Sequence, residues 1–231
     1  MKKTILAVGA HPDDLDFSSA GTIAKFAREG GEVFYLIISD GSRGGHKVKF
    51  AGRKLAGIRK KEQLAAARVL GVKNVFFLNL QDGEIENTRL LRKKIVKAVR
   101  KTRPDIVFCF DPANLAFDGP KLFHRDHRQA AEAVFDAVYP AAGSPFFFPE
   151  LLRQGYEPHQ PKEIWFFGSA RPGKFVDISP TMEKKITALF CHESQLPDKE
   201  GIRKRIVDRA RKTGKVKGLK YAEAFRTLKL E

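Results

Sequence analysis

The sequence predicts an α/β fold: a Rossmann-like three-layer sandwich with a mostly parallel sheet and helices on both faces. Short β-branched and aromatic runs alternate along the chain with longer segments of helical periodicity, which is the pattern of consecutive strand–helix–strand units. The chain has 231 residues, and 42% of them are hydrophobic, so it can bury one sizeable core. We therefore expect a single domain over residues 1–231.

Five apolar runs are the expected strands. The second run, EVFYLIIS, is the clearest because it is β-branched and aromatic along most of its length. In chain order the runs are Thr4–Ala10, Glu32–Ser39, Asn74–Leu78, Asp105–Phe110 and Glu163–Phe167. Runs this short and this apolar are typical of the buried strands of a parallel sheet.

Four segments with helical periodicity separate these strands, and Gly30 and Gly71 end the first two. The segments are Ser18–Arg28, Leu55–Leu70, Arg89–Lys101 and Asp126–Tyr139. The stretch Ala141–Pro161 is rich in Pro, Gly and Phe, and we expect it to form a cap or rim. Residues from about 198 to 231 are expected to form a small C-terminal helical appendage within the same domain.

The net charge is +16, from 43 basic and 27 acidic residues, which keeps open a non-catalytic module that binds nucleic acid. The densest basic stretch, Arg203–Lys220, lacks interleaved aromatic residues, so we expect no nucleic-acid partner. No apolar stretch is long enough for a membrane span or a secretory signal, which predicts a cytoplasmic protein without a membrane anchor. Two cysteines, Cys109 and Cys191, are too few for a disulfide framework.

The first expected strand leads directly into the sequence AHPDDLDF. This segment places one imidazole and three carboxylates within six residues: His11, Asp13, Asp14 and Asp16. Without a compensating charge these groups would repel and desolvate one another, and a divalent cation supplies that charge. The turn also lacks the pattern GxGxxG, and its acidic residues would repel a pyrophosphate, which excludes dinucleotide binding.

A second cluster, FHRDHRQA, contains His124, Asp126 and His127 and opens the fourth expected helix. In an open parallel sheet the ligand site lies beyond the carboxyl ends of the strands. Both clusters follow such ends, so both should lie on the same rim of the sheet. Two imidazoles and one carboxylate, with a fourth position for water, form the ligand set of a catalytic zinc. Together the clusters predict a zinc-dependent hydrolase.

These two loops resemble those of the LmbE/PIG-L family of zinc-dependent N-acetylglucosaminyl deacetylases, whose motifs are AHPDDE and HPDH. Similar features run over nearly the whole chain: SDG at Ser39–Gly41, Arg-x-x-Glu at Arg59–Glu62, the turn Asp82-Gly83, HESQ at His192–Gln195 and YAEAFR at Tyr221–Arg226. The chain departs from the motifs in two places. Leu15 stands at the family's Glu position, with Asp16 beside it, and Arg125 replaces the usual Pro. The first departure bears on the groups that support the metal ligands, and the second on loop stiffness or a substrate contact.

The resemblance implies a role for each matching residue. The ligands of Zn²⁺, or of another divalent ion that this donor set accepts, would be His11, Asp14 and His127. Asp13 would be the general base. Protonated His124 would stabilise the developing oxyanion, and Asp126 would orient it.

The resemblance also implies a small N-acetylated amino sugar of the N-acetylglucosamine type as substrate. Because relatives often form trimers or hexamers, it further implies a homo-oligomer. The site-side loops carry residues suited to sugar hydroxyl groups, namely Arg43, Arg53 and Asp82. A zinc hydrolase of another small amide, such as an N-acyl amino acid, stays open as an alternative.

Overall fold

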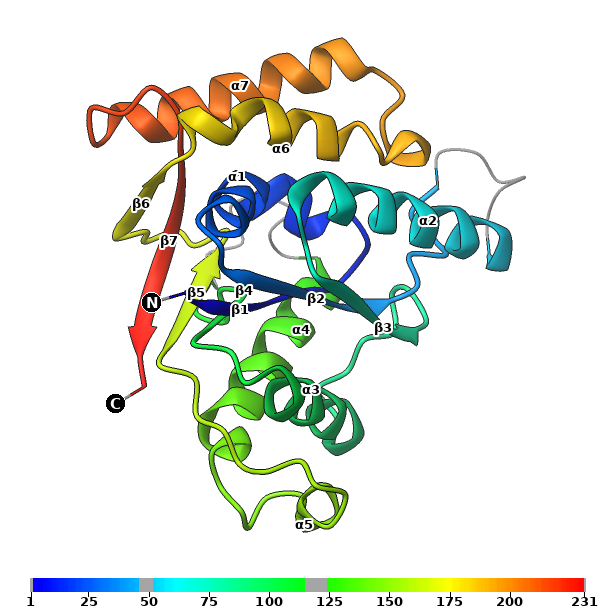
Figure 1. The fold of residues 1–231 in the computed structure, drawn as a ribbon. Coiled ribbons are helices and arrows are strands. Elements are labelled where there is room, and N and C mark those ends of the chain that lie inside the picture. Colours follow the sequence, from blue (N-terminus) through cyan, green and yellow to red (C-terminus); the bar gives the residue numbers. More distant parts are fainter. Residues whose placement is uncertain (1, 46–51, 115–123, 231) are drawn as a thin grey trace.

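The computed structural model describes residues 2–45, 52–114 and 124–230, and within them seven strands form one sheet. The strand order is β3-β2-β1-β4-β5-β7-β6 (Figure 1). The strands are β1 (Thr4–Gly9), β2 (Glu32–Ser39), β3 (Asn74–Leu80), β4 (Ile106–Phe110), β5 (Glu163–Phe167), β6 (Lys174–Asp177) and β7 (Ala222–Lys229). Neighbouring strands from β3 to β5 pair in parallel. The five expected strands and the mostly parallel sheet are confirmed.

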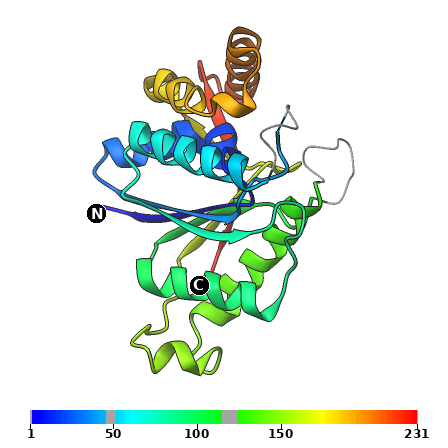
Figure 2. The same ribbon diagram turned by 90° about the vertical axis from the view of Figure 1, so that its right-hand side faces the viewer.

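Helices cover both faces of this sheet (Figure 2). One face carries α1 (Asp14–Arg28) and α2 (Arg53–Leu70), and the other carries α3 (Arg89–Thr102) and α4 (Arg125–Asp136). Successive side chains of a strand point to opposite faces. In β1, Leu6 therefore packs into the cluster with α3 and α4, whereas Ile5 packs into the cluster with α1 and α2. The expected α/β sandwich is confirmed.

The segment after α4 packs against α3 as a cap. α4 ends at Asp136 and passes into the π-helical turn η2 (Ala137–Ala142). The α-helix therefore ends before Tyr139, where the expected helix ended. The short helix α5 (Pro149–Leu152) follows. The guanidinium of buried Arg100, in α3, donates hydrogen bonds of 2.7–3.1 Å to the carbonyls of Ala141, Ala142, Ser144 and Phe147. No hydrogen bond in the described part of the chain joins this segment to the histidine and aspartate loops.

The C-terminal region adds an outer layer on one side of the sandwich. α6 (Met182–Leu189) packs on α1 and α2, and α7 (Lys199–Lys215) packs on α6 (Figure 1). Two 3₁₀ turns precede and follow α6, at Ser179–Thr181 and Glu193–Gln195. None of the helices in the described ranges is both long enough and apolar enough to cross a membrane.

The prediction of a purely helical appendage after residue 198 was wrong. α7 is helical, but β7 enters the central sheet between β5 and β6 and runs antiparallel to both. The sequence concealed this strand because it carries charged residues, which usually indicate a solvated segment. Two of them, Glu223 and Arg226, are instead paired inside the fold, with Lys185 and Asp111 respectively.

Candidate metal centre

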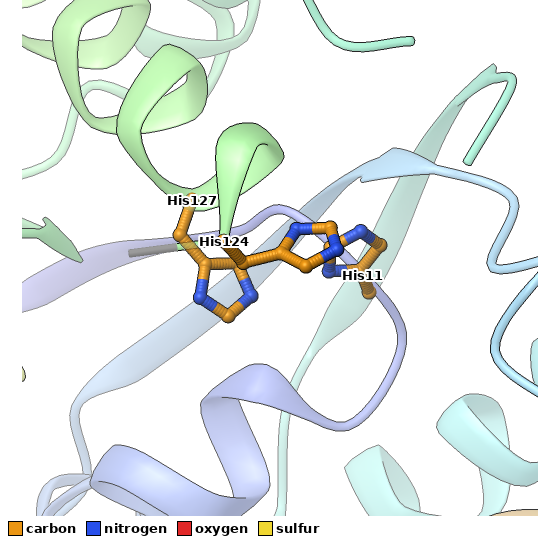
Figure 3. Close-up of side chains that lie close together, drawn as sticks. All are labelled: His11, His124 and His127. Atoms are coloured by element: carbon orange, nitrogen blue, oxygen red, sulfur yellow. The ribbon is translucent and has the colours of Figure 1, made fainter. Parts of the chain in front are cut away.

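Three histidines converge where β1 ends and α4 begins (Figure 3). His11 follows β1, whereas His124 is the N-cap of α4 and His127 lies in its first turn. β1 and β4 are neighbouring parallel strands, so the loops that follow them open at the same edge of the sheet. The three ring centroids lie 5.0–5.3 Å apart. The two sequence clusters therefore meet in one site.

Asp14 lies between two of these histidines. Its carboxylate oxygens lie 3.5 Å from His11 Nδ1 and 3.2 Å from His127 Nε2. Two donors that each bind one tetrahedral zinc at about 2.1 Å lie roughly 3.4 Å apart, and each of these two separations is close to that value, the first at Oδ2 of Asp14 and the second at Oδ1. The three histidines form an alternative set, in which the ligand atoms lie within 4.8 Å of one another. In the described residues, the sets whose three ligand atoms all lie this close are the three histidines and His11 with Asp82 and Asp126. The set with Asp14 rests on the family resemblance and on the two pairwise separations.

The second ring nitrogen of His11 faces two carboxylates. His11 Nε2 lies 3.1 Å from Asp82 Oδ1 and 3.1 Å from Asp126 Oδ2. These three residues could also surround a cation, but Asp126 already accepts two backbone N–H bonds from residues 83–85. A carboxylate in this place fixes the tautomer and orientation of a metal-binding histidine. Asp126 contacts His124 through its backbone N–H, which donates to His124 Nδ1 at 3.3 Å, whereas its carboxylate contacts His11.

Asp13 occupies a constrained position beside these groups. Its φ of 96° is left-handed, which is uncommon for a residue with a side chain and persists only where the surroundings impose it. Two residues of α2 hold it: Gln63 Oε1 accepts its backbone N–H at 2.9 Å, and Arg59 Nη2 lies 3.1 Å from its carboxylate. Burial raises the pKa of Asp13 to about 6, against the charge of Arg59. A carboxyl group with such a pKa is suited to general-base catalysis.

The histidines differ in their affinity for protons. Burial lowers the pKa of His11, but hydrogen bonds to Asp126, Asp14 and Asp82 outweigh burial and raise this pKa to about 12. A metal ion competes with that proton for the ring nitrogen. Burial also lowers the pKa of His124, and the charges of His11 and the neighbouring His127 lower it further. The charge of Asp126 acts in the opposite direction and raises the pKa of His124.

Asp16 supports the first loop through contacts with α2 and with the turn after α6. Its fully buried carboxylate accepts a hydrogen bond from Gln63 Nε2 at 2.7 Å and lies 2.9 Å from His192 Nε2. Gln63 in turn holds the backbone of Asp13, so Asp16 acts on the loop through α2. The position where the family has Glu holds the buried apolar Leu15, and Asp16 supplies a carboxylate from the next position.

Three further residues of the site were not predicted as site residues. They are Arg59, Gln63 and His192. The similarity of the segments Arg59–Glu62 and His192–Gln195 to family motifs was the signal that pointed to Arg59 and His192, and Gln63 follows the first segment directly. Without the fold, that signal could not show that α2 and the turn after α6 both face the first loop.

The Arg125 that replaces the family's Pro fastens α4 to the neighbouring loop. Its guanidinium donates to the carbonyls of Gly83 and Ile85 at 3.2 and 2.7 Å, and it lies 3.0 Å from Glu86. These bonds stiffen the start of the helix that carries His127. The structure thus favours loop stiffness over a substrate contact for this residue.

The three predicted substrate contacts lie in different surroundings. Asp82 is buried at the site, where its Oδ2 accepts the backbone N–H of Arg43 at 3.0 Å. The Arg43 side chain is half exposed and pairs with Glu84 at 2.8 Å. Arg53 begins α2 with an exposed side chain, and within the described ranges no hydrogen bond or ion pair links it to this rim. Parts of two predicted site loops, residues 46–51 and 115–123, lie outside the described residues.

The fold and the site together define a class of protein, the α/β metal-dependent hydrolases, in which a His–Asp–His cluster and a neighbouring carboxylate lie at the carboxyl ends of parallel strands. Within that class, the chain belongs to the PIG-L family, described as GlcNAc-PI de-N-acetylase, which matches residues 6–138. The resemblance inferred from the two loops is confirmed.

Individual relatives extend the match over nearly the whole chain. Diacetylchitobiose deacetylase from Thermococcus kodakarensis is 38% identical over 226 residues, which cover 97% of this chain and 82% of the relative. The solved structure of N,N'-diacetylchitobiose deacetylase from Pyrococcus horikoshii has a TM-score of 0.90 at 34% identity, covering 98% of this chain and 84% of that one. A 4-oxalmesaconate hydratase from Pseudomonas putida is 27% identical over 205 residues, 84% of this chain and 74% of the relative.

Proposed function

We propose that this chain is a metal-dependent N-deacetylase that removes the acetyl group from an amino sugar of the N-acetylglucosamine type. The observation that carries the proposal is the cluster of His11, Asp14 and His127 with Asp13 beside it, in a chain 38% identical to a diacetylchitobiose deacetylase over 97% of its length. Family membership also favours an enzyme over the nucleic-acid-binding module that the charge of +16 left open.

Zn²⁺ is the metal we assign first, and His11, Asp14 and His127 would hold it. Their donor set of two imidazoles and one carboxylate, and the separations of 3.2 and 3.5 Å, suit that ion. When bound, the ion would lower the pKa of a water molecule toward neutrality and polarise the amide carbonyl. Other divalent first-row ions accept the same donors, so the metal needs a direct measurement.

Asp13 and His124 would carry the proton chemistry. Asp13 takes a proton from the attacking water and returns it to the leaving nitrogen when the amide C–N bond breaks. Its raised pKa, about 6, makes that return efficient. His124 Nδ1 accepts the backbone N–H of Asp126, so the proton of the neutral ring lies on Nε2. From there His124 would donate a hydrogen bond to the developing oxyanion.

Substrate contacts would come from the rim beside His11. Asp82 is buried at that rim and Arg43 lies next to it, so both can contact sugar hydroxyl groups there. Arg53 would need to reach the sugar from the exposed start of α2. We keep all three as proposed contacts, with Arg53 as the weakest.

The test is a comparison of substrates with the zinc-loaded protein. Release of free amine is measured with N-acetylglucosamine, N,N'-diacetylchitobiose and a set of N-acetyl amino acids. We expect hydrolysis of the sugars, and loss of that activity in His127→Ala together with loss of bound zinc. A clear preference for N-acetyl amino acids would overturn the sugar assignment and leave the metal-dependent mechanism standing. Full zinc content in His127→Ala would overturn the ligand assignment.

A further inference from the structure

An apolar cavity adjoins the candidate metal centre on the side of Asp14 and His127. Its volume is about 580 Å³, within the range of roughly 300–1,000 Å³ that is typical of small-molecule sites. Apolar side chains from five parts of the chain form most of its wall: Phe17, Phe110, Phe167, Leu196, Ile202 and Ile206. Ser18 and Gln195 add polar groups to this wall. The methyl group of an acetyl substituent fills only a small part of such a space.

The cavity is continuous with the proposed metal ligands. Asp14 and His127 both form part of its wall, and the ring of Phe110 stacks on the ring of His127 with centroids 4.1 Å apart. Two carboxylates that do not line the cavity lie beside His11, whose Nε2 contacts Asp82 and Asp126. The centre therefore has a mainly apolar wall beside Asp14 and His127 and a hydrogen-bonding wall beside His11.

An amide substrate has two arms that differ in the same way. The nitrogen carries the sugar, whose hydroxyl groups need hydrogen-bond partners, whereas the carbonyl carbon carries the acyl group, which is apolar. With the carbonyl at the metal centre, the sugar matches the side of Asp82 and the acyl group matches the side of Phe110. Each further CH₂ group that leaves water for an apolar cavity favours binding by about fourfold.

We propose that this cavity holds the acyl group of the substrate, and that the enzyme hydrolyses N-acyl amino sugars with acyl chains longer than acetyl. The inference rests on the proposed function and extends it to a broader class of substrate. Water adds to the acyl carbon, the C–N bond breaks, and the products are a short-chain carboxylate and the free amino sugar. Exposed residues at the mouth, Pro197, Asp198, Arg205 and Arg209, mark where a longer chain would meet solvent.

The test compares N-acetyl-, N-butanoyl- and N-hexanoylglucosamine as substrates of the zinc-loaded protein. We expect kcat/KM for the hexanoyl compound to equal or exceed that for the acetyl compound. Ile202→Trp fills the cavity from α7 and should lower the ratio of the hexanoyl to the acetyl value by about tenfold or more. Pro197→Trp narrows the exposed mouth and should lower the same ratio without disturbing a buried position. Leu90→Trp, at an exposed position of α3, is the control and should leave the ratio unchanged.

The outcomes separate this inference from the proposed function. If the wild type hydrolyses the acetyl compound but turns over the hexanoyl compound more than about 100-fold more slowly, the cavity is not an acyl site and the deacetylase proposal stands. If neither compound is hydrolysed, both proposals fail. Where Ile202→Trp does not fold by circular dichroism, Pro197→Trp decides, and an unchanged ratio in that variant overturns the inference.

Discussion

The first loop, residues 11–16, and the last strand, β7, both shape the site, but over very different distances along the chain. The loop gathers its reactive groups within six residues. β7 acts through long-range contacts: Arg226 pairs with Asp111, 115 residues earlier, and Glu223 accepts the backbone N–H of Gly21 and Thr22, about 200 residues earlier. The reactive groups of the first loop are thus close together in sequence, whereas the position of α1, the helix that carries Asp14, depends on contacts with β7.

Glu223 shows how this long-range support works. Its carboxylate lies 2.6 Å from Lys185 Nζ, and both side chains are almost fully buried. Lys185 also donates to the carbonyl of Phe17, so the ion pair joins β7 and α6 to the backbone of α1. A mutation in the loop should therefore change chemistry without changing stability much, and a mutation at Glu223 should do the reverse.

Asp13→Asn gives the largest effect expected on the loop side of this comparison. An amide cannot accept the proton, so kcat should fall by about 10²–10⁴-fold while one equivalent of zinc stays bound. Steady-state kinetics and elemental analysis measure the two quantities, with Asp208→Asn on the surface of α7 as the control. A kcat close to that of the wild type would assign the base to another group.

Glu223→Ala tests the strand side. Removal of one partner leaves Lys185 buried without its counter-charge, which should lower the free energy of unfolding by about 3–5 kcal/mol. Guanidinium unfolding monitored by circular dichroism measures the loss. The matched control is Glu183→Ala, which removes an exposed ion pair with Arg203 and should have a much smaller effect. Equal losses of unfolding free energy in the two variants would show that the buried ion pair contributes no more to stability than the exposed one.

Asp126→Asn tests whether a residue at the start of α4 supports metal binding by the first loop. The carboxylate holds the ring of His11, so its loss should weaken zinc binding by about 10–100-fold. Competition with a chromogenic chelator gives the affinity, and Asp136→Asn, at the other end of α4, is the control. An unchanged affinity would mean that Asp82 alone orients His11.

The smallest effect is a pH dependence. Burial raises the pKa of Asp13 to about 6, and the base is active as the carboxylate. Activity should therefore be present above that pKa and decline as the pH falls through it, so kcat/KM should drop about tenfold between pH 7 and pH 5. Zinc content is measured at each pH. If Asp13→Asn retains the same step in its residual activity, the step belongs to a different residue.

Most of the parallel sheet could be predicted because its strands are short and apolar and are separated by helices, the first two of which end at glycines. The two reactive loops could be predicted because their residues are close in sequence and follow strand ends. The histidine that contacts the Asp126 carboxylate could not be predicted, because the choice between His11 and His124 depends on ring orientation in the folded protein. β7 was missed because a buried carboxylate and a paired arginine look like surface residues until their partners are known.

The place of β7 in the sheet has a consequence for folding. Residues 222–229 follow every other strand in the chain, yet they lie between β5 and β6. Until they dock, β5 presents an open edge to other chains, and such edges promote aggregation. Contacts that close loops of 115 to about 200 residues also form slowly. We therefore expect nascent or refolding chains to pass through a stage in which the reactive loops have been synthesised but β7 does not yet hold α1 in place. The exposure of the β5 edge in that stage sets how much chaperone protection the protein needs.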